Sequence, residues 1–365
     1  MVNGYIMNHT KIEKRNVEEM MGLTAMQEGM LFHYLADPGS WRYFEQFRFK
    51  LAGEINIQRF EDAWAAVAQV NEMLRAVIRW EQLEEPVQIV LNDKKIPIRV
   101  LDLCGENQAA LPAALAKIAA DDKNEIIDLT ANPLRITLIL TGTAESEMII
   151  TFHHILYDGW SNGIVLQEFL EAYNRLAGGE VPGKIEKTKY KEFIKWLQND
   201  RLQNKDKHEE FWKNFLAGFN TRTLLPYDTG KTGDIRRVQT VREDIAPVLK
   251  KQVEAFSQAH NATLAAILYT AWGVLLQKYN NADDIIFGTT VSGRVPEIKG
   301  SDTMVGLFIN TVPLRLKTTG AHTVLEVLAE TGAHLQERTA YEHSPLTAIR
   351  QWSAMGQESQ LFDSI

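Results

Sequence analysis

The stretch from residue 152 to residue 161 reads FHHILYDGWS and carries the strongest structural signal in the sequence. An apolar run that starts at Met148 leads into it, and helical spacing of apolar residues begins at about Trp160. The pattern therefore predicts a strand, a short loop and a helix. Because neighbouring residues on a strand face opposite sides, His153 and His154 cannot point the same way. We expect one histidine to face a cleft and the other to support it.

Several simpler interpretations of these residues remain open. Both histidines would also suit a buried, hydrogen-bonded environment without any catalytic role. Asp158 would serve equally well as the N-cap of the helix, and Gly159 as a turn residue. A metal site is not predicted, because His-His-x-x-x-Asp lacks the usual ligand spacing and no Cys or Glu cluster completes it.

Strand and helix patterns alternate on both sides of this stretch, without internal repeats. The glycine-rich segment 177–187 is the best candidate boundary. It divides the chain into an N-terminal lobe over 21–180 and a C-terminal lobe over 181–365, preceded by a linker or docking segment over 1–20. Strands are expected over 43–51, 86–91, 98–103, 134–140, 147–155, 236–245, 284–291 and 304–316. Helices are expected over 57–80, 111–120, 160–176, 190–219, 246–260, 263–279 and 323–339.

Composition excludes several classes of protein. The 365 residues carry 39 basic and 47 acidic side chains, a net charge of −8, which argues against a general nucleic-acid binder. The single cysteine, Cys104, rules out a disulfide framework and fits a reducing compartment. Neither a signal peptide nor a membrane span is predicted, so a cytoplasmic protein is expected.

The stretch around His153 resembles the HHxxxDG signature of condensation domains of nonribosomal peptide synthetases, which are relatives of chloramphenicol acetyltransferase. Further segments resemble other motifs of that family, in the family's order and in the form found in tyrocidine- and gramicidin-type bacterial synthetases. One position departs from the pattern, because Val70-Asn71 stands where the second motif opens with Arg-His. The matching segments are LTAMQEGMLFH at 23–33, NEMLR at 71–75, YKEFIKW at 190–196, FGTTVSGR at 287–294, VGLFINT at 305–311 and YEHSPL at 341–346.

The resemblance implies an α/β (α+β) fold of two chloramphenicol-acetyltransferase-like lobes. These would form a V-shaped pseudo-dimer with the active site at their interface. It implies peptide-bond formation between a donor aminoacyl or peptidyl thioester and the amine of an acceptor aminoacyl thioester. Both would be tethered by phosphopantetheine arms to an upstream and a downstream peptidyl carrier domain, beside an adenylation domain. No intrinsic cofactor, nucleic acid or membrane is expected.

Within that resemblance, His154 is expected to hydrogen-bond the attacking amine, as a base or as a positioning group. The backbone N–H of Gly159 is expected to stabilise the oxyanion. His153, Asp158 and Arg75 are expected to support the site, with Arg75 as the ion-pair partner of Asp158. Candidates for lining the cleft are Trp160, Ser161, Ser292, Arg294 and Asn310.

Other activities of the same fold remain as alternatives. An epimerisation domain shares the two histidines, but its signature runs Asp-Gly-x-Ser-Trp rather than the Asp-Gly-Trp-Ser of 158–161. Heterocyclisation domains carry paired aspartates instead, a coenzyme A-dependent acyltransferase has no motif here, and a non-catalytic carrier-docking module would not need the histidines. Family members normally continue beyond the position of Ile365 into another strand and a closing segment, so an incomplete C-terminal lobe is expected.

Overall fold

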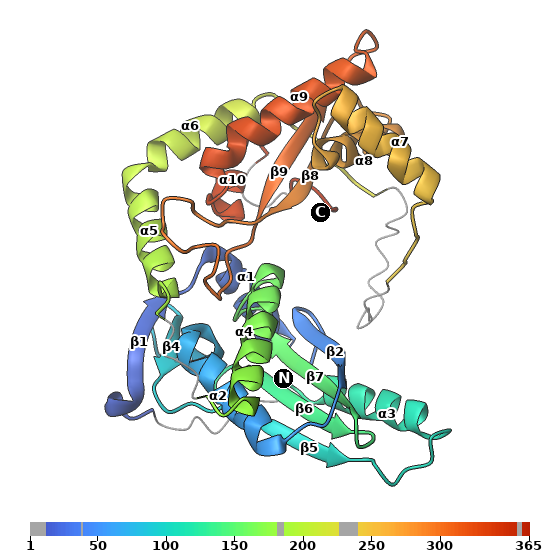
Figure 1. Ribbon diagram of the computed structural model, residues 1–365. Helices are drawn as coiled ribbons and strands as arrows, with labels where there is room; N and C mark the ends of the chain where they lie inside the picture. The colour runs from blue at the N-terminus through green and yellow to red at the C-terminus, as the bar shows by residue number, and fades with distance from the viewer. Residues whose placement is uncertain (1–11, 38, 181–185, 226–239, 356–359) are drawn as a thin grey trace. The chain divides into compact units, whose positions relative to one another are not determined.

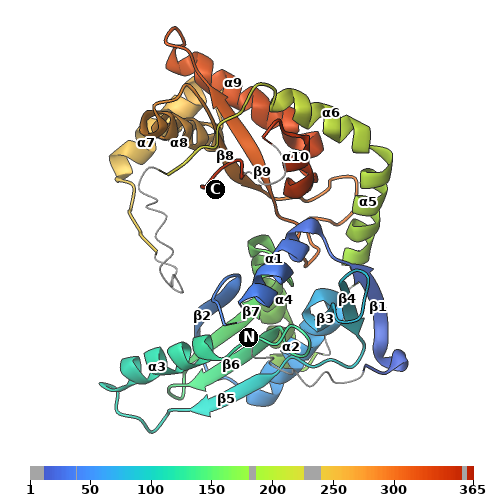
Figure 2. The same cartoon turned by 180° about the vertical axis from the view of Figure 1, so that it is seen from behind.

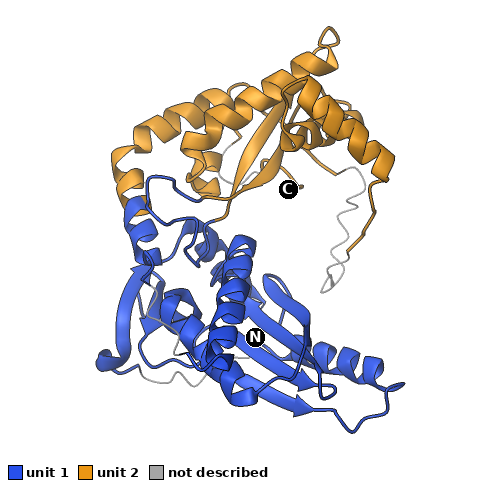
Figure 3. Cartoon of the chain, viewed as in Figure 1, with its two compact units in different colours: residues 1–196, 294–308 blue, residues 197–293, 309–365 orange. Residues whose placement is uncertain are grey.

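The computed structural model describes residues 12–37, 39–180, 186–225, 240–355 and 360–365. These residues form two compact units (Figure 3). Unit 1 comprises residues 1–196 and 294–308, and unit 2 comprises residues 197–293 and 309–365. We call 294–308, the part of the second half that belongs to unit 1, the return segment. The division expected at about residue 180 therefore differs from this grouping, since residues 186–196 and the return segment both fall in unit 1.

Unit 1 contains two sheets (Figure 1). In the first, β7 (Glu145–His153) pairs antiparallel with both β2 (Phe44–Ala52) and β6 (Leu134–Leu140), and β5 (Ile98–Asp102) joins β6 in parallel. Strands β6 and β7 follow one another in the chain and form an antiparallel hairpin. The second sheet is antiparallel, and its order is β1 (Val17–Gly22), β4 (Val87–Leu91) and β3 (Ala76–Arg79). The helices are α1 (Ala25–Ala36), α2 (Ile57–Val70), α3 (Leu111–Asn124), α4 (Gly159–Ala177) and the first part of α5 (Tyr190–Gln203), whose residues from Leu197 onward belong to unit 2, with 3-10 turns at Lys14–Asn16 and Glu72–Arg75.

Strand β7 is central in its sheet, and its residues from Ser146 to His153 are buried. Helix α3 covers one face of the sheet, where Ala119 packs against Ile139 and Ile149 (Figure 2). Helices α2 and α4 pack together through Trp64 and Phe169, whose rings stack with centroids 4.6 Å apart. A rigid, buried strand thus leads directly to the residues of the signature stretch.

Unit 2 contains a two-stranded antiparallel sheet, β8 (Asp284–Val291) with β9 (Asn310–Lys317). Its core gathers around Trp212, Ile286 and Val312 on one side and around Leu276 and Leu314 on the other. The remaining elements are α6 (Lys205–Phe215), α7 (Pro247–Ala259), α8 (Leu264–Asn280), α9 (Val324–Glu337), the 3-10 turn Arg338–Tyr341 and α10 (Leu346–Trp352).

The helix expected over 57–80 is wrong beyond Val70. There Asn71 caps α2, with both its backbone N–H and its side-chain amide donating to the Val67 carbonyl. The apolar residues that follow continue the pattern, but they belong to a 3-10 turn and to the buried strand β3. A buried strand and a helix face cannot be distinguished by periodicity over so short a run.

Four further expectations differ from the structure. The helix expected over 190–219 is broken at Asn204 into α5 and α6. The strand expected over 304–316 begins only at Asn310, because two backbone N–H groups before it donate to side chains of unit 1 rather than to a sheet. The strand expected over 236–245 is absent from residues 240–245, which are exposed, and residues 236–239 lie outside the described residues. Residues 17–20, expected to be part of a linker, belong to β1, while residues 1–11 lie outside the described part.

Candidate active site

The loop of residues 154–158 joins β7 to α4, and its backbone is anchored from several directions. The N–H of His154 donates to the Tyr43 carbonyl at 2.8 Å, and the N–H of Asp158 donates to the Gly306 carbonyl at 3.1 Å. Tyr43 adopts a φ of 59°, which is rare for an aromatic residue. The structure therefore maintains an unfavourable backbone conformation immediately beside the loop.

His153 is 3% exposed and lies between the rings of Tyr34 and Tyr43. Its Nδ1 accepts a hydrogen bond from the Ile155 N–H at 3.1 Å, so the neutral ring carries its proton on Nε2. Burial, with a smaller contribution from His154, lowers the pKa of His153 to about 3. His153 is therefore an uncharged acceptor for the loop at neutral pH.

His154 lies one residue further on, where the strand has ended, and it is half-buried. Its Nδ1 atom is buried and has no hydrogen-bond partner within the described part of the chain. In most histidines a partner at one ring nitrogen fixes which nitrogen carries the proton. No partner at Nδ1 among the described residues therefore fixes the tautomer of His154.

Asp158 is the N-cap of α4 and is 1% exposed. Its carboxylate accepts from the N–H of Ser161 at 3.0 Å and from the hydroxyl of Ser161 at 2.9 Å. The N–H of Phe308, in the return segment, donates to its second oxygen at 3.1 Å. The carboxylate thus caps the helix and also holds the return segment.

The charge of Asp158 is balanced by Arg294, whose Nη2 lies 3.4 Å from Oδ1. The Arg294 side chain is only 8% exposed, its guanidinium lies 4.2 Å from the ring centroid of Phe308, and it donates to the Met304 and Ser301 carbonyls. Desolvation lowers the pKa of Arg294, and Asp158 opposes that effect. Arg294 thus gathers the return segment around Asp158.

The expected ion pair between Arg75 and Asp158 is therefore wrong. Arg75 is buried in the 3-10 turn that leads into β3, where its Nη1 contacts Glu18 at 2.6 Å and its Nε donates to the Ala68 carbonyl at 2.8 Å. The motif match identified an arginine, but it could not specify which carboxylate the arginine would contact. The true partner, Arg294, was present in the sequence only as a candidate for lining the cleft.

Gly159 is the first residue of α4, directly after the N-cap. A Cβ built at this position meets no atom within 4 Å, so the space beside its backbone is open. The first N–H groups of a helix have no partner within the helix, and together with the helix dipole they favour negative charge. The geometry at Gly159 is thus compatible with binding an oxyanion.

The other expected site residues fall into two groups. In unit 1, Trp160 is 60% exposed and donates to the Asp302 carbonyl, whereas Ser161 is fully buried around Asp158. In unit 2, Ser292 is exposed. The side-chain amide of Asn310 donates hydrogen bonds to two backbone carbonyls of the turn at residues 342–344. Their expected place in the lining of a cleft stays a prediction.

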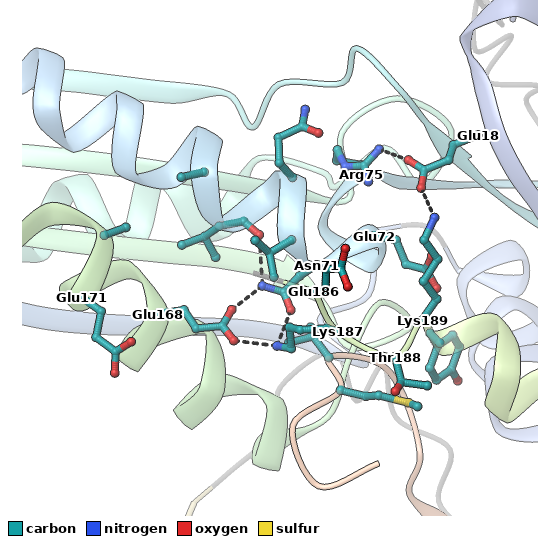
Figure 4. Close-up of a pocket in the computed structure, with 18 of the residues that line it drawn as sticks. Glu18, Asn71, Glu72, Arg75, Glu168, Glu171, Glu186, Lys187, Thr188 and Lys189 are labelled. Carbon is teal, nitrogen blue, oxygen red and sulfur yellow. Dashed lines mark hydrogen bonds and ion pairs between the residues drawn. The ribbon is translucent and has the colours of Figure 1, made fainter. Parts of the chain in front are cut away.

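A cavity of about 770 Å³ lies in unit 1 between α2, α4 and the segment 186–190 (Figure 4). None of the expected catalytic residues lines it. Several of its charges are paired with one another: Lys187 contacts Glu168 at 2.6 Å and also Asn71 at 2.8 Å, and Glu18 contacts Arg75 and Lys189. In the described part of the chain, no group of three or more His, Cys, Asp or Glu side chains is placed to hold a metal ion.

No single helix among the described residues has the length and apolar character needed to cross a membrane. The bent pair α7 and α8 meets those criteria only when the two helices are taken together.

Fold and site together define a protein of two α/β units in which a half-buried histidine precedes the N-terminus of a helix. The condensation-domain family profile matches residues 17–365, and the chain belongs to that family. The resemblance inferred from the motifs is thereby confirmed.

The most similar relatives include very long synthetases. Bacitracin synthase 1 of Bacillus licheniformis is 34% identical over 344 residues, and Tyrocidine synthase 2 of Brevibacillus parabrevis is 34% identical over 348 residues. Each match covers 94% of this chain, but only 6% and 10% of the respective synthetase.

Solved structures agree on the fold. The first condensation domain of the calcium-dependent antibiotic synthetase, in complex with a substrate analogue, superposes with a TM-score of 0.77 at 17% identity, covering 96% of this chain and 80% of that one. The starter condensation domain of rhizomide synthetase gives 0.76 at 19% identity, covering 94% and 76%. The predicted mixed α/β fold is confirmed.

Proposed function

We propose that this chain forms peptide bonds in nonribosomal peptide synthesis. A donor aminoacyl or peptidyl thioester would be transferred to the amine of an acceptor aminoacyl thioester. The observation that carries the proposal is the placement of His154 at the end of a buried central strand, one loop before a helix N-terminus, in a member of the condensation-domain family. The partners would be an upstream donor and a downstream acceptor peptidyl carrier domain, next to an adenylation domain, and the phosphopantetheine arms of the carriers would present the substrates.

The chemistry needs modest assistance. An α-amino group has a pKa of about 8, so a useful fraction is neutral at pH 7 to 8, and a thiol of pKa about 8.5 leaves readily as thiolate. The amine nitrogen attacks the thioester carbonyl, the C–N bond forms, the C–S bond breaks, and the proton lost by the amine is available to the thiolate. Holding the two reactants in attack geometry therefore supplies much of the acceleration.

Each of the two central residues has a role in this scheme. His154 would hydrogen-bond the attacking amine through Nε2, since its Nδ1 is buried. The N–H of Gly159 would stabilise the oxyanion that develops on the donor carbonyl, because a helix N-terminus favours negative charge and no side chain blocks the approach. His153 and Asp158 would keep the intervening loop in place.

No metal or intrinsic cofactor enters this proposal, because amine and thioester carry all the required reactivity. We also infer that the protein acts in the cytoplasm, where the single, exposed Cys104 would stay reduced.

The test supplies the chain with donor- and acceptor-loaded carrier domains in a panel of aminoacyl pairs. Intact-protein mass spectrometry then detects the dipeptidyl product on the acceptor carrier. We expect product with the wild type and a loss of about 10²-fold in rate with His154→Ala, in the range typical of losing a positioned acid–base group. His322→Ala, which removes an exposed histidine of unit 2, should leave the rate unchanged.

The possible outcomes separate the alternatives. Absence of product from every pair would overturn the condensation proposal. Exchange of the donor α-proton without amide formation would identify an epimerase, and carrier binding without either reaction would identify a docking module. Product formation at the wild-type rate by His154→Ala would contradict only the role given to His154.

A further inference from the structure

Gln27 lies in α1 with no exposed surface, and its side-chain amide makes four hydrogen bonds. Its Oε1 accepts from the backbone N–H of Thr24 at 2.9 Å and from Nε2 of Gln88 at 3.3 Å. Its Nε2 donates to Oε1 of Gln88 at 3.0 Å and to the carbonyl of Ile155 at 2.9 Å. The amide therefore uses both donors and both acceptor positions that it possesses.

The orientation of this amide follows from its partners. The N–H of Thr24 can only donate, so the amide oxygen must face it. The amide nitrogen must then face Ile155, whose carbonyl can only accept. Gln88 is held in turn, because its own Nε2 donates to the Gly22 carbonyl at 2.8 Å. The pair of glutamines thus forms a fully bonded bridge from β1 and β4 to the loop of residues 154–158.

The peptide groups of Ile155 are fixed on both sides. Its N–H donates to Nδ1 of His153, and its carbonyl accepts from Gln27. Because Ile155 directly follows His154, these two bonds fix the backbone that carries the His154 ring. Gln27 reaches this position from a part of the chain 128 residues away.

A purely structural role in capping α1 would not require an amide. Helix α9 has the same capping box as α1, formed by Thr323 and Glu326, and there a carboxylate accepts from the N-cap N–H. A glutamate at position 27 would cap α1 equally well, but an ionised carboxylate cannot donate to Ile155. The amide is therefore explained by the contact with the loop rather than by the cap.

We propose that Gln27, supported by Gln88, is a positioning residue for His154 and acts through the peptide of Ile155. This inference rests on the proposed function of His154 in amide formation. Gln27 lies outside the set of residues that the motifs assigned to the site, although it stands within the first matching segment.

The first test compares two variants that each remove a buried glutamine amide. Gln27→Met removes the bridge to Ile155, and Gln277→Met removes a comparable bridge in unit 2, where the Gln277 amide donates to the Asp283 carbonyl at 2.7 Å. Multiple-turnover transfer between loaded carriers, followed at a series of carrier concentrations, gives kcat and KM for each. Gln27→Met should lower kcat by about 10²-fold with KM unchanged, the loss typical of a reacting group displaced by about 1 Å. Gln277→Met should keep the wild-type kcat.

A second variant tests the donor itself and avoids a large change of shape. In Gln27→Glu, the protonated acid can still donate to Ile155 while its other oxygen accepts from Thr24. The ionised form cannot donate, and it sets a negative charge against the Ile155 carbonyl. The ratio of variant to wild-type kcat should therefore fall as pH rises, whereas a ratio independent of pH would contradict a role for the donated hydrogen bond.

A measurement without substrates separates this proposal from the proposed function. Amide hydrogen exchange of residues 154–158, followed by NMR on the whole chain, should be faster in Gln27→Met than in the wild type and unchanged in Gln277→Met. If the wild type forms no product, the proposed function fails and the exchange rates alone decide whether Gln27 orders the loop. Equal exchange in both variants, or a kcat loss shared by both, would overturn the positioning role.

Discussion

Acidification should destabilise this protein through His153 in particular. The ring is buried and neutral, and its pKa of about 3 lies far below the value of about 6.5 that an unfolded chain gives it. Between these two values the unfolded state binds a proton that the folded state does not. The contribution of His153 to the free energy of unfolding is therefore complete above pH 6.5 and is lost as pH falls towards 3.

The size of the effect follows from the shift. The pKa of His153 differs by about 3.5 between the unfolded and the folded chain, which corresponds to a change of about 5 kcal/mol in the free energy of unfolding between pH 6.5 and pH 3. With these two pKa values, the free energy of unfolding should fall by about 2 kcal/mol between pH 7 and pH 5. That loss is a substantial fraction of the stability of an ordinary domain.

The assay is urea unfolding of the wild type and of His153→Asn at pH 7, 6 and 5. The asparagine oxygen can accept from the Ile155 N–H as Nδ1 of His153 does, but it does not titrate. The variant should be less stable at pH 7, because the contacts of the ring with Tyr34 and Tyr43 are lost. Its free energy of unfolding should then fall by about 2 kcal/mol less than that of the wild type between pH 7 and pH 5.

Taking the difference between the two proteins removes the contribution of every other titrating group, including His208, whose pKa is also lowered by burial. Parallel pH profiles for wild type and variant would refute the reasoning. They would mean that His153 is solvated or charged in the folded protein, and that its ring does not serve the loop as a neutral acceptor.

Further predictions concern the charges and the glycine beside the loop. Asp158→Ala should lower the free energy of unfolding by about 3–5 kcal/mol in urea, because it leaves Arg294 buried without its counter-charge. Gly159→Ala should stay within about 0.5 kcal/mol of the wild type, since open space surrounds the position, yet slow product formation in single turnover as its methyl enters the substrate's path. Arg75→Met should cost about 1–3 kcal/mol while leaving kcat unchanged, because Arg75 pairs with Glu18 and not with the loop.

Each of these predictions has a matched comparison. Asp158→Asn keeps an oxygen that can cap α4 but removes the charge that faces Arg294, so it should cost nearly as much as the alanine variant, and a much smaller loss would argue against a buried ion pair. Gly163→Ala lies one turn further along α4 with equal space around it, and it should raise the free energy of unfolding by about 0.5–1 kcal/mol, because alanine is the better helix former, while leaving the rate unchanged. A fall in kcat for Arg75→Met as large as that for Asp158→Ala would restore the pairing expected from the motif.

Periodicity predicted most elements of the fold because most are amphipathic or bounded by clear turns. The strand β7 and helix α4 were predicted almost to their ends. Failures occurred where a tertiary contact replaced the local pattern. Residues after Val70 leave the helix because Asn71 binds the Val67 carbonyl, and the strand ending at Lys317 starts late because the N–H of Phe308 is taken by Asp158.

The site was predictable in its residue types but not in its partnerships. His153, Asp158 and Ser161 lie within nine consecutive residues, so a short sequence motif can identify them as candidate site residues. The contacts of Arg294 and Gln27 with this loop span 136 and 128 residues, and no local pattern encodes them. A buried glutamine in a capping box looks the same in sequence whether or not its amide nitrogen also reaches a distant loop.

These long-range contacts also determine when the site can form. Fixing the backbone of one residue costs about 1–2 kcal/mol of conformational entropy, so ordering five loop residues costs about 5–10 kcal/mol. The bonds that offset this cost come from Gln27 before the loop and from the return segment after it. Because the return segment follows residues 197–293 of unit 2, the chain must be complete through Phe308 before Asp158 has its partners. A chain ending at Gly293 should therefore retain β7 but show fast hydrogen exchange in residues 154–158, and slow exchange there would mean that the N-terminal contacts suffice.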